Sequence, residues 1–190
     1  MTRISLPLCL SALALSLVLY SAWLPAKAWL AHALIKHSWQ QKQREGGQFK
    51  PWPWADMHAI ASLKLARLNQ EIIVLQGADP SSLAFSAGAM HGYSELNRHS
   101  PVVIAGHKDS HFSFLQDILM KDVISLTNAK GINQLYQVEN IDIIDTADTD
   151  IVLAENQPNL ILITCYPFDS STAGGTMRYV ITAKLLGESG

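Results

Sequence analysis

The feature that most constrains the fold is a succession of short, strand-like runs between residues 60 and 186. Turn residues separate several runs, as at Asn69-Gln70 and Ala129-Lys130-Gly131. Helical periodicity is brief, at 80–85 and 112–119, so the crossover helices of a parallel α/β sheet are missing. The pattern predicts a mostly β domain, either a closed barrel or a sandwich. The runs are 60–66, 71–75, 101–105, 123–127, 132–138, 141–145, 151–154, 160–164 and 178–186.

An uncharged apolar run from Ile4 to Leu24 precedes this region. A helix of about twenty such residues can span a bilayer, and we expect Pro25 to end it. The alternative is a cleaved signal peptide, because Ala26-Lys27-Ala28 has the small-x-small form of a cleavage site. The length of the run favours a retained anchor. In either case the rest of the chain is predicted to lie outside the cytoplasm.

We therefore expect three parts: a transmembrane anchor (1–25), a juxtamembrane helix and linker (26–55), and one folded domain (56–190). Trp23, Trp29 and Trp39 either rest at the membrane interface or pack on the domain. The formal net charge of −2 gives no basic surface for nucleic acid, so no nucleic-acid partner is expected.

The exported part holds one thiol, Cys165, because Cys9 lies inside the apolar run. Cys165 follows the run 160–164 directly, so a strand would fix its position at the end of a sheet. An unpaired thiol in an oxidising compartment indicates either a reactive group or an intermolecular bridge. The alternative is a buried structural cysteine, which is the commoner role of this residue.

A cysteine nucleophile needs a base that takes its proton or stabilises the thiolate. Five histidines are candidates (His58, His91, His99, His107 and His111), and spacing alone does not choose among them. His107 and His111 gain weight because they follow the strand 101–105. His107-x-Asp109-x-His111 together with Cys165 can also be read as a metal site, although no second exported cysteine or dense carboxylate group supports it. We expect no metal or cofactor.

Arg178 opens the last strand-like run. If this run pairs with the strand that ends at Cys165, the guanidinium returns close to the thiol. A charged donor fork there can stabilise an oxyanion or hold a substrate carbonyl. The alternative is an arginine of an edge strand that faces solvent.

Three segments together resemble the sortases: Val103-Ile104-Ala105-Gly106-His107, Leu162-Ile163-Thr164-Cys165, and Arg178 at the start of the last strand. The resemblance extends from about Met57 to Leu186 and is greatest to the single-domain sortases of Gram-negative bacteria. It implies a closed eight-stranded sortase-type β-barrel with short helices. It also implies a membrane-anchored cysteine transpeptidase that cleaves an LPXTG-type motif between Thr and Gly near the C-terminus of a secreted protein.

By this resemblance Cys165 is the nucleophile, His107 the acid/base and Arg178 the oxyanion or substrate-positioning group, while His91 and Thr164 are candidate substrate-binding residues. The chain departs from the family at Ile161, where Thr is frequent, and at Lys108, where Arg is frequent. The implied place is the bacterial inner membrane, with the domain on the extracytoplasmic side, and the acceptor amine is not indicated. A thiol hydrolase with the same three residues, or a tethered binding module with an inert Cys165, remains open.

Overall fold

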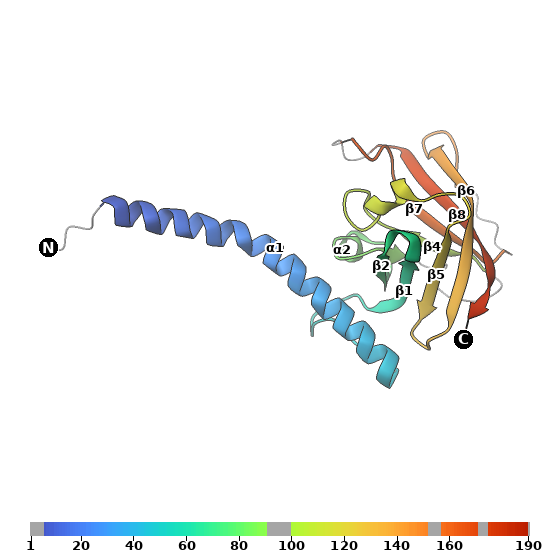
Figure 1. Cartoon of the computed structure of the whole chain (residues 1–190), viewed down its shortest axis with the longest axis horizontal. Helices are drawn as coiled ribbons and strands as arrows, with labels where there is room; N and C mark the ends of the chain where they lie inside the picture. The colour runs from blue at the N-terminus through green and yellow to red at the C-terminus, as the bar shows by residue number, and fades with distance from the viewer. Residues whose placement is uncertain (1–5, 91–99, 152–156, 171–174, 190) are drawn as a thin grey trace.

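The computed structural model describes residues 6–90, 100–151, 157–170 and 175–189. In this part of the chain eight strands close into a barrel in the order β1-β2-β3-β4-β7-β8-β6-β5, from which one long helix extends (Figure 1). The structure confirms the predicted mostly β barrel and excludes the sandwich. The strands are β1 (Ala59–Leu65), β2 (Gln70–Gln76), β3 (Gly88–Ala89), β4 (Val102–Ala105), β5 (Val123–Asn128), β6 (Asn133–Asp145), β7 (Asn159–Cys165) and β8 (Met177–Ser189). The helices are α1 (Leu6–Glu45), α2 (Pro80–Leu83) and the 3₁₀ turns η1 (Ala66–Leu68) and η2 (Ser113–Asp117).

The strands differ from the expected runs at three places. The runs 132–138 and 141–145 form the single strand β6, whose pairing with β8 shifts register between Val138 and Asn140. Glu139 and Asn140 are both exposed there, which breaks the alternation and made one strand resemble two. The two-residue strand β3 was not predicted. Ile151 lies outside any strand, and the rest of the run 151–154 lies outside the described residues.

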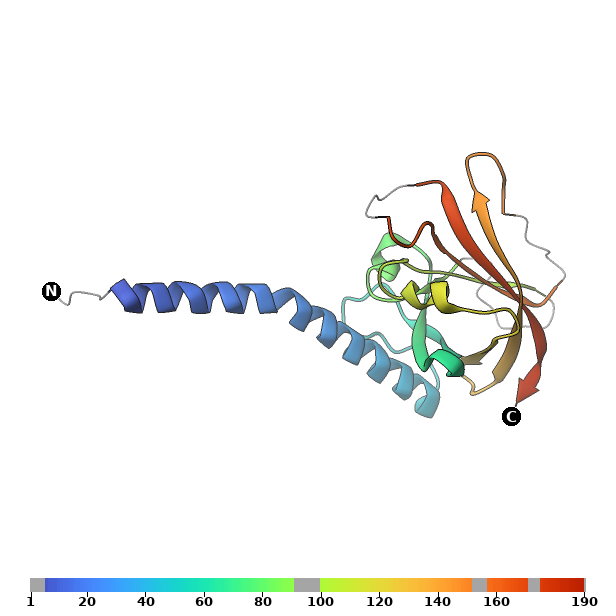
Figure 2. The same ribbon diagram turned by 45° about the horizontal axis from the view of Figure 1, so that its top comes forward.

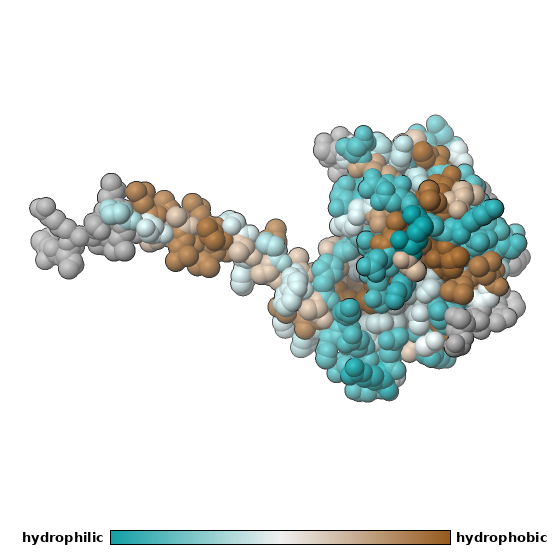
Figure 3. All heavy atoms as spheres, viewed as in Figure 1, coloured by the Kyte–Doolittle hydropathy of each residue, from teal (hydrophilic) through white to brown (hydrophobic). Residues whose placement is uncertain are grey.

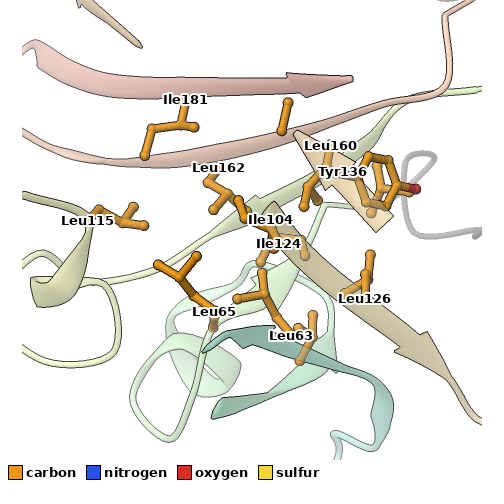
Figure 4. Packing of buried hydrophobic residues seen from close by; sticks show 14 of the residues in the cluster. Leu63, Leu65, Ile104, Leu115, Ile124, Leu126, Tyr136, Leu160, Leu162 and Ile181 are labelled. Atoms are coloured by element: carbon orange, nitrogen blue, oxygen red, sulfur yellow. The ribbon is translucent and has the colours of Figure 1, made fainter. Parts of the chain in front are cut away.

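The barrel interior is filled by side chains that recur every second residue along each strand (Figure 4). Leu160 and Leu162 of β7 are fully buried and lie beside Ile104 of β4 and Ile181 of β8. Tyr136 is equally buried, and its hydroxyl donates to Gln134 Oε1 at 2.8 Å. β4 pairs parallel to β7, and β8 pairs antiparallel to it. The paired residues fix the register of these three strands.

Helix α1 continues through Pro25, so the expectation that Pro25 ends the helix is wrong. Figures 1 and 2 show a bend partway along the helix. Pro25 gives its physical cause, since proline removes one helical hydrogen bond and its ring clashes with the preceding turn. From Leu10 to Glu45 the helix is long and apolar enough to cross a membrane.

The second half of α1 packs on the barrel. Ile35 and Trp39 are 2% and 4% exposed and cluster with Met57 and Leu75. Lys42 Nζ donates to the carbonyl of Ala59 at 2.8 Å. Of the three tryptophans considered for the interface, Trp39 therefore packs on the domain, whereas Trp23 and Trp29 are exposed.

Candidate active site

The alternation that fills the barrel also assigns three side chains to its outer face. Val103 of β4, Ile161 of β7 and Val180 of β8 form an outer-face cluster that is separate from the core. Successive side chains of a strand point to opposite faces. On the same face, Cys165 follows Ile161 by four residues and Arg178 precedes Val180 by two, whereas His107 lies two residues beyond the end of β4. The strands therefore direct Cys165 and Arg178 to one side of the barrel, and β4 brings the backbone of His107 to the end of β7.

Cys165 and Arg178 are direct partners in the antiparallel ladder between β7 and β8, which is the condition under which Arg178 returns to the thiol strand. Directly opposite residues share a face, with Cβ atoms about 4.5–5.5 Å apart. The guanidinium is half-buried, and its Nη1 donates to the carbonyls of Gly175 at 2.6 Å and Met177 at 2.9 Å. Backbone carbonyls at the start of β8 thus hold the guanidinium of the residue that pairs with the half-buried Cys165.

The parallel ladder of β4 and β7 brings the segment that carries His107 to the end of β7, because Ala105 pairs with Ile163. One residue further, Gly106 N donates to Ile163 O at 3.2 Å, and Thr164 Oγ1 donates to Gly106 O at 2.7 Å. These bonds extend the pairing beyond the strand. His107, which is exposed, follows Gly106 directly, and Cys165 follows Thr164 directly.

The turn that carries His107 is closed on itself. The carbonyl of His107 accepts hydrogen bonds from Ser110 N at 3.3 Å and Phe112 N at 3.0 Å. The ring of Phe112 is fully buried against Gly106, where an added Cβ would lie 2.8 Å from its Cγ and Cδ2 atoms. Glycine at 106 therefore permits the close packing that fixes the start of the histidine loop.

Lys108 is a site residue whose role the sequence did not reveal. It is only 8% exposed, and its Nζ donates to Pro167 O at 2.7 Å and also to Ser170 O. Asp109 lies 3.8 Å from the same ammonium. Lys108 therefore ties the loop that carries His107 to the loop that follows Cys165.

An aromatic cluster holds the same loop from its other side. Tyr166 stacks on Tyr179 of β8 with centroids 6.2 Å apart, and Phe168 meets Tyr179 edge-on at 5.2 Å. Tyr166 N also donates to Met177 O at 3.1 Å. The described residues directly after the thiol are thus anchored to β8 as well as to Lys108.

His111 lies against α1 rather than beside the thiol strand. Its ring meets the ring of His32 edge-on, with centroids 5.4 Å apart. Burial, helped by the nearby His32 and His107, lowers the pKa of His111 to about 4. Among the described residues, no three His, Cys, Asp or Glu side chains gather in a geometry that could hold a metal ion.

The two candidate substrate-binding residues are Thr164, which is buried, and His91, which the structure does not describe. Thr164 is 3% exposed on the inner face of β7, and its hydroxyl is committed to the carbonyl of Gly106. The side chain of Thr164 therefore lies on the face of β7 opposite to that of Cys165. His91 lies outside the described residues.

Comparison with known proteins places this arrangement in a family. The model of the Sortase domain family matches residues 63–186. Sortase D of Bacillus subtilis (strain 168) is 28% identical over 127 residues, which are 66% of this chain and 63% of that relative. The chain therefore spans less than two thirds of the length of this curated relative.

Solved structures share the fold at lower identity. A Clostridium perfringens Sortase D5 transpeptidase is similar with a TM-score of 0.62 and 18% identity, covering 83% of this chain and 96% of that chain. Sortase A from Corynebacterium diphtheriae has a TM-score of 0.60 and 21% identity, covering 80% and 67%. Sortase A of Listeria monocytogenes has a TM-score of 0.58 and 21% identity, covering 69% and 89%. The family match spans nearly the whole barrel, and the chain belongs to the sortase family.

Proposed function

We propose that the chain is a membrane-anchored cysteine transpeptidase that cleaves an LPXTG-type motif between Thr and Gly and transfers the acyl group to an amine. The observation that carries the proposal is the in-register pair of Cys165 and Arg178, with His107 two residues beyond the strand that pairs with β7. A nucleophile, an acid/base and a fixed donor fork are the groups that acyl transfer requires.

In the first half-reaction the Cys165 thiolate attacks the carbonyl carbon of the motif threonine. The charge that develops on the carbonyl oxygen is stabilised by N–H groups of Arg178, which the loop carbonyls already orient. The C–N bond to glycine breaks, and His107 gives a proton to the leaving amine. A thioester between Cys165 and the threonine remains.

In the second half-reaction an acceptor amine loses a proton to His107 and attacks the thioester. A new amide forms, and the thiolate of Cys165 leaves.

The outer face also offers apolar surface for the substrate. Ile163 lies two residues before Cys165 on the same face, and Ile144 of β6 pairs with Arg178. Both are half-buried and pack against the outer-face cluster. Ile163 lies beside the thiol on β7 and Ile144 lies beside Arg178 on β6, and these positions suit an apolar side chain of the motif.

The proposed partner is a secreted protein with a C-terminal LPXTG-like sorting signal. The proposed location is the bacterial inner membrane, with the barrel on the extracytoplasmic side and α1 as a single-pass anchor. A substrate that carries its own membrane helix would meet the enzyme in one bilayer at a raised effective concentration.

A thiol hydrolase is the second candidate. Its support is the exposure of His107 and the partial exposure of Cys165, which give water access to a thioester. The fate of the acyl group separates the two functions.

The test is mass spectrometry of the detergent-purified chain with an LPXTG-type peptide, with and without an added amine. We expect an acyl adduct on Cys165 that the amine discharges into a ligated peptide. Hydrolysis at a rate that no amine changes would instead establish the hydrolase. If no adduct forms and an electrophile at neutral pH fails to label Cys165, the chain is a binding module and the proposal is wrong.

A further inference from the structure

Two adjoining grooves lie where α1 meets the barrel domain. The larger, of about 480 Å³, lies between Leu30 and Leu34 of α1 and the aromatic residues Trp52, Trp54 and Phe85. The smaller, of about 330 Å³, begins at Leu24 and also contacts Phe85. Lys27 lines both. Together they form one apolar surface, here called the paired grooves.

The paired grooves continue the exposed apolar surface of the anchor. Residues of α1 such as Leu17 and Leu24 are 61% and 75% exposed, and Figure 3 shows hydrophobic residues along the protruding part of the helix. Trp29 and Trp54 are 73% and 78% exposed at the level of the grooves. Exposed tryptophan beside an apolar span is typical of the headgroup region of a bilayer.

Basic and acidic residues are unevenly distributed along the chain, with the basic excess in the segment that contains most of α1. Residues 1–44 hold five of the 14 Lys and Arg residues and none of the 16 Asp and Glu residues, a formal charge of +5. The remaining residues then carry −7, which gives the net −2 of the whole chain. Lys27 lies over the ring of Trp23, 4.8 Å from its centroid. Asp56 also lines the larger groove but not the smaller one, so Lys27 is the charged residue common to both.

We propose that the paired grooves bind an anionic phospholipid, with an acyl chain along Leu30, Trp54 and Phe85 and the phosphate at Lys27. This inference rests on the membrane anchoring in the proposed function. A second helix is a poorer occupant: one turn of a helix about 10 Å across fills ~420 Å³, so the larger groove takes about one turn. A flexible acyl chain can instead follow both grooves, and a basic segment favours an anionic headgroup.

Lipid in the paired grooves would set the height of the active site above the membrane. His32 lines the smaller groove and contacts His111, which lies near His107 in the catalytic loop. His32 follows Leu24 by eight residues, or about 12 Å of helix. The bound lipid would therefore hold the histidine loop close to the headgroups. A motif that directly precedes a membrane helix leaves the bilayer at this height.

The experiment uses the full chain in nanodiscs of zwitterionic phospholipid, with or without a minority of phosphatidylglycerol. The photo-crosslinking variant Trp54→p-benzoylphenylalanine is irradiated, and intact-mass spectrometry measures lipid adducts. The matched control is Ile143→p-benzoylphenylalanine, because Ile143 is 48% exposed on β6 and outside the paired grooves. We expect phospholipid adducts at residue 54, enriched in phosphatidylglycerol, and at least tenfold fewer at residue 143.

The variant Lys27→Gln, made in the residue-54 crosslinking background, tests the headgroup contact. We expect the enrichment in phosphatidylglycerol to fall by about fivefold, which is the effect of one lysine near an anionic surface. Equal adducts at residues 54 and 143, enrichment unchanged by Lys27→Gln, or adducts with a second copy of the chain would each overturn the lipid proposal.

A peptide-cleavage assay on the same nanodiscs separates this proposal from the proposed chemistry. Adducts without cleavage would reject the transpeptidase and leave the lipid site standing. Cleavage without adducts would reject only the lipid site. A chain that does not remain with the nanodiscs would reject both the anchor and the lipid site.

Discussion

Cys165, the last residue of β7, lies directly opposite Arg178 in the antiparallel ladder with β8. Both residues are therefore held by paired strands and not by a loop. Sites on strands are positioned more rigidly than sites on loops. Because the two residues lie on different strands, each can be substituted while the other stays in place.

Arg178→Lys keeps the charge and removes the planar fork. We expect kcat/KM for an LPXTG-type peptide to fall by roughly 10²–10³, the usual effect of losing an oxyanion donor. The matched control is Lys184→Arg, since Lys184 is exposed on the same strand and its long side chain faces solvent. Steady-state kinetics with near-normal turnover for Arg178→Lys would reduce Arg178 to a structural residue of the loop.

Cys165→Ala should abolish cleavage while leaving the barrel folded. The side chain is half-buried at a strand end, so the loss of one sulfur opens no core cavity. Peptide cleavage measures the first expectation, and circular dichroism with thermal unfolding measures the second. More than trace activity in a variant free of wild-type protein would contradict the assignment of the nucleophile.

His107→Ala should lower kcat by roughly 10²–10⁴, the range for general acid–base catalysis. His111→Ala should cost much less, because His111 lies against His32 of α1. The two variants form a matched pair within one loop. If His111→Ala is the more damaging in the cleavage assay, the acid/base assignment must move to His111.

Lys108→Met preserves the aliphatic length and removes the ammonium. The carbonyls of Pro167 and Ser170 then lose a charged donor, and the loop after Cys165 loses its tie to the histidine loop. We expect kcat to fall by about tenfold and the free energy of unfolding to fall by about 1–3 kcal/mol. Lys130→Met, at an exposed turn, should change neither quantity. Unchanged turnover in Lys108→Met would show that this tie does not position the site.

The barrel could be predicted because its signals are local. Apolar runs separated by turn residues mark the strands, as the run from Leu160 to Ile163 marks β7. Because this run is apolar at every position, it does not show which face points inward, and only the packing of the barrel places the side chain of Thr164 on the inner face. Cys165, one residue later, falls on the opposite face because successive side chains of a strand alternate.

Other features depend on contacts between distant segments. The partners of Lys108 lie 59 and 62 residues further along the chain, so no local pattern predicts them. The helix continues through Pro25 although proline costs about 3 kcal/mol in a helix interior. Packing of Ile35 and Trp39 on the barrel stabilises the second half of this helix independently.

The last prediction concerns acid sensitivity at His111. Its folded pKa is lowered from 6.5 to about 4, chiefly by burial. The unfolded chain therefore binds a proton at a higher pH than the folded chain does. The stabilisation is complete above pH 6.5 and is lost as the pH falls towards 4.

The size of the effect follows from the same shift. Each pKa unit corresponds to about 1.4 kcal/mol, but partial exposure of the ring reduces the effect to the order of 1 kcal/mol. His111→Gln removes this titration and keeps a polar side chain. We expect the wild type to lose more stability than His111→Gln between about pH 7.5 and about pH 4.5 in urea unfolding of the detergent-solubilised chain. A stability difference that stays constant across this range would show that His111 does not titrate on unfolding, and acid loss would then have to arise from other groups.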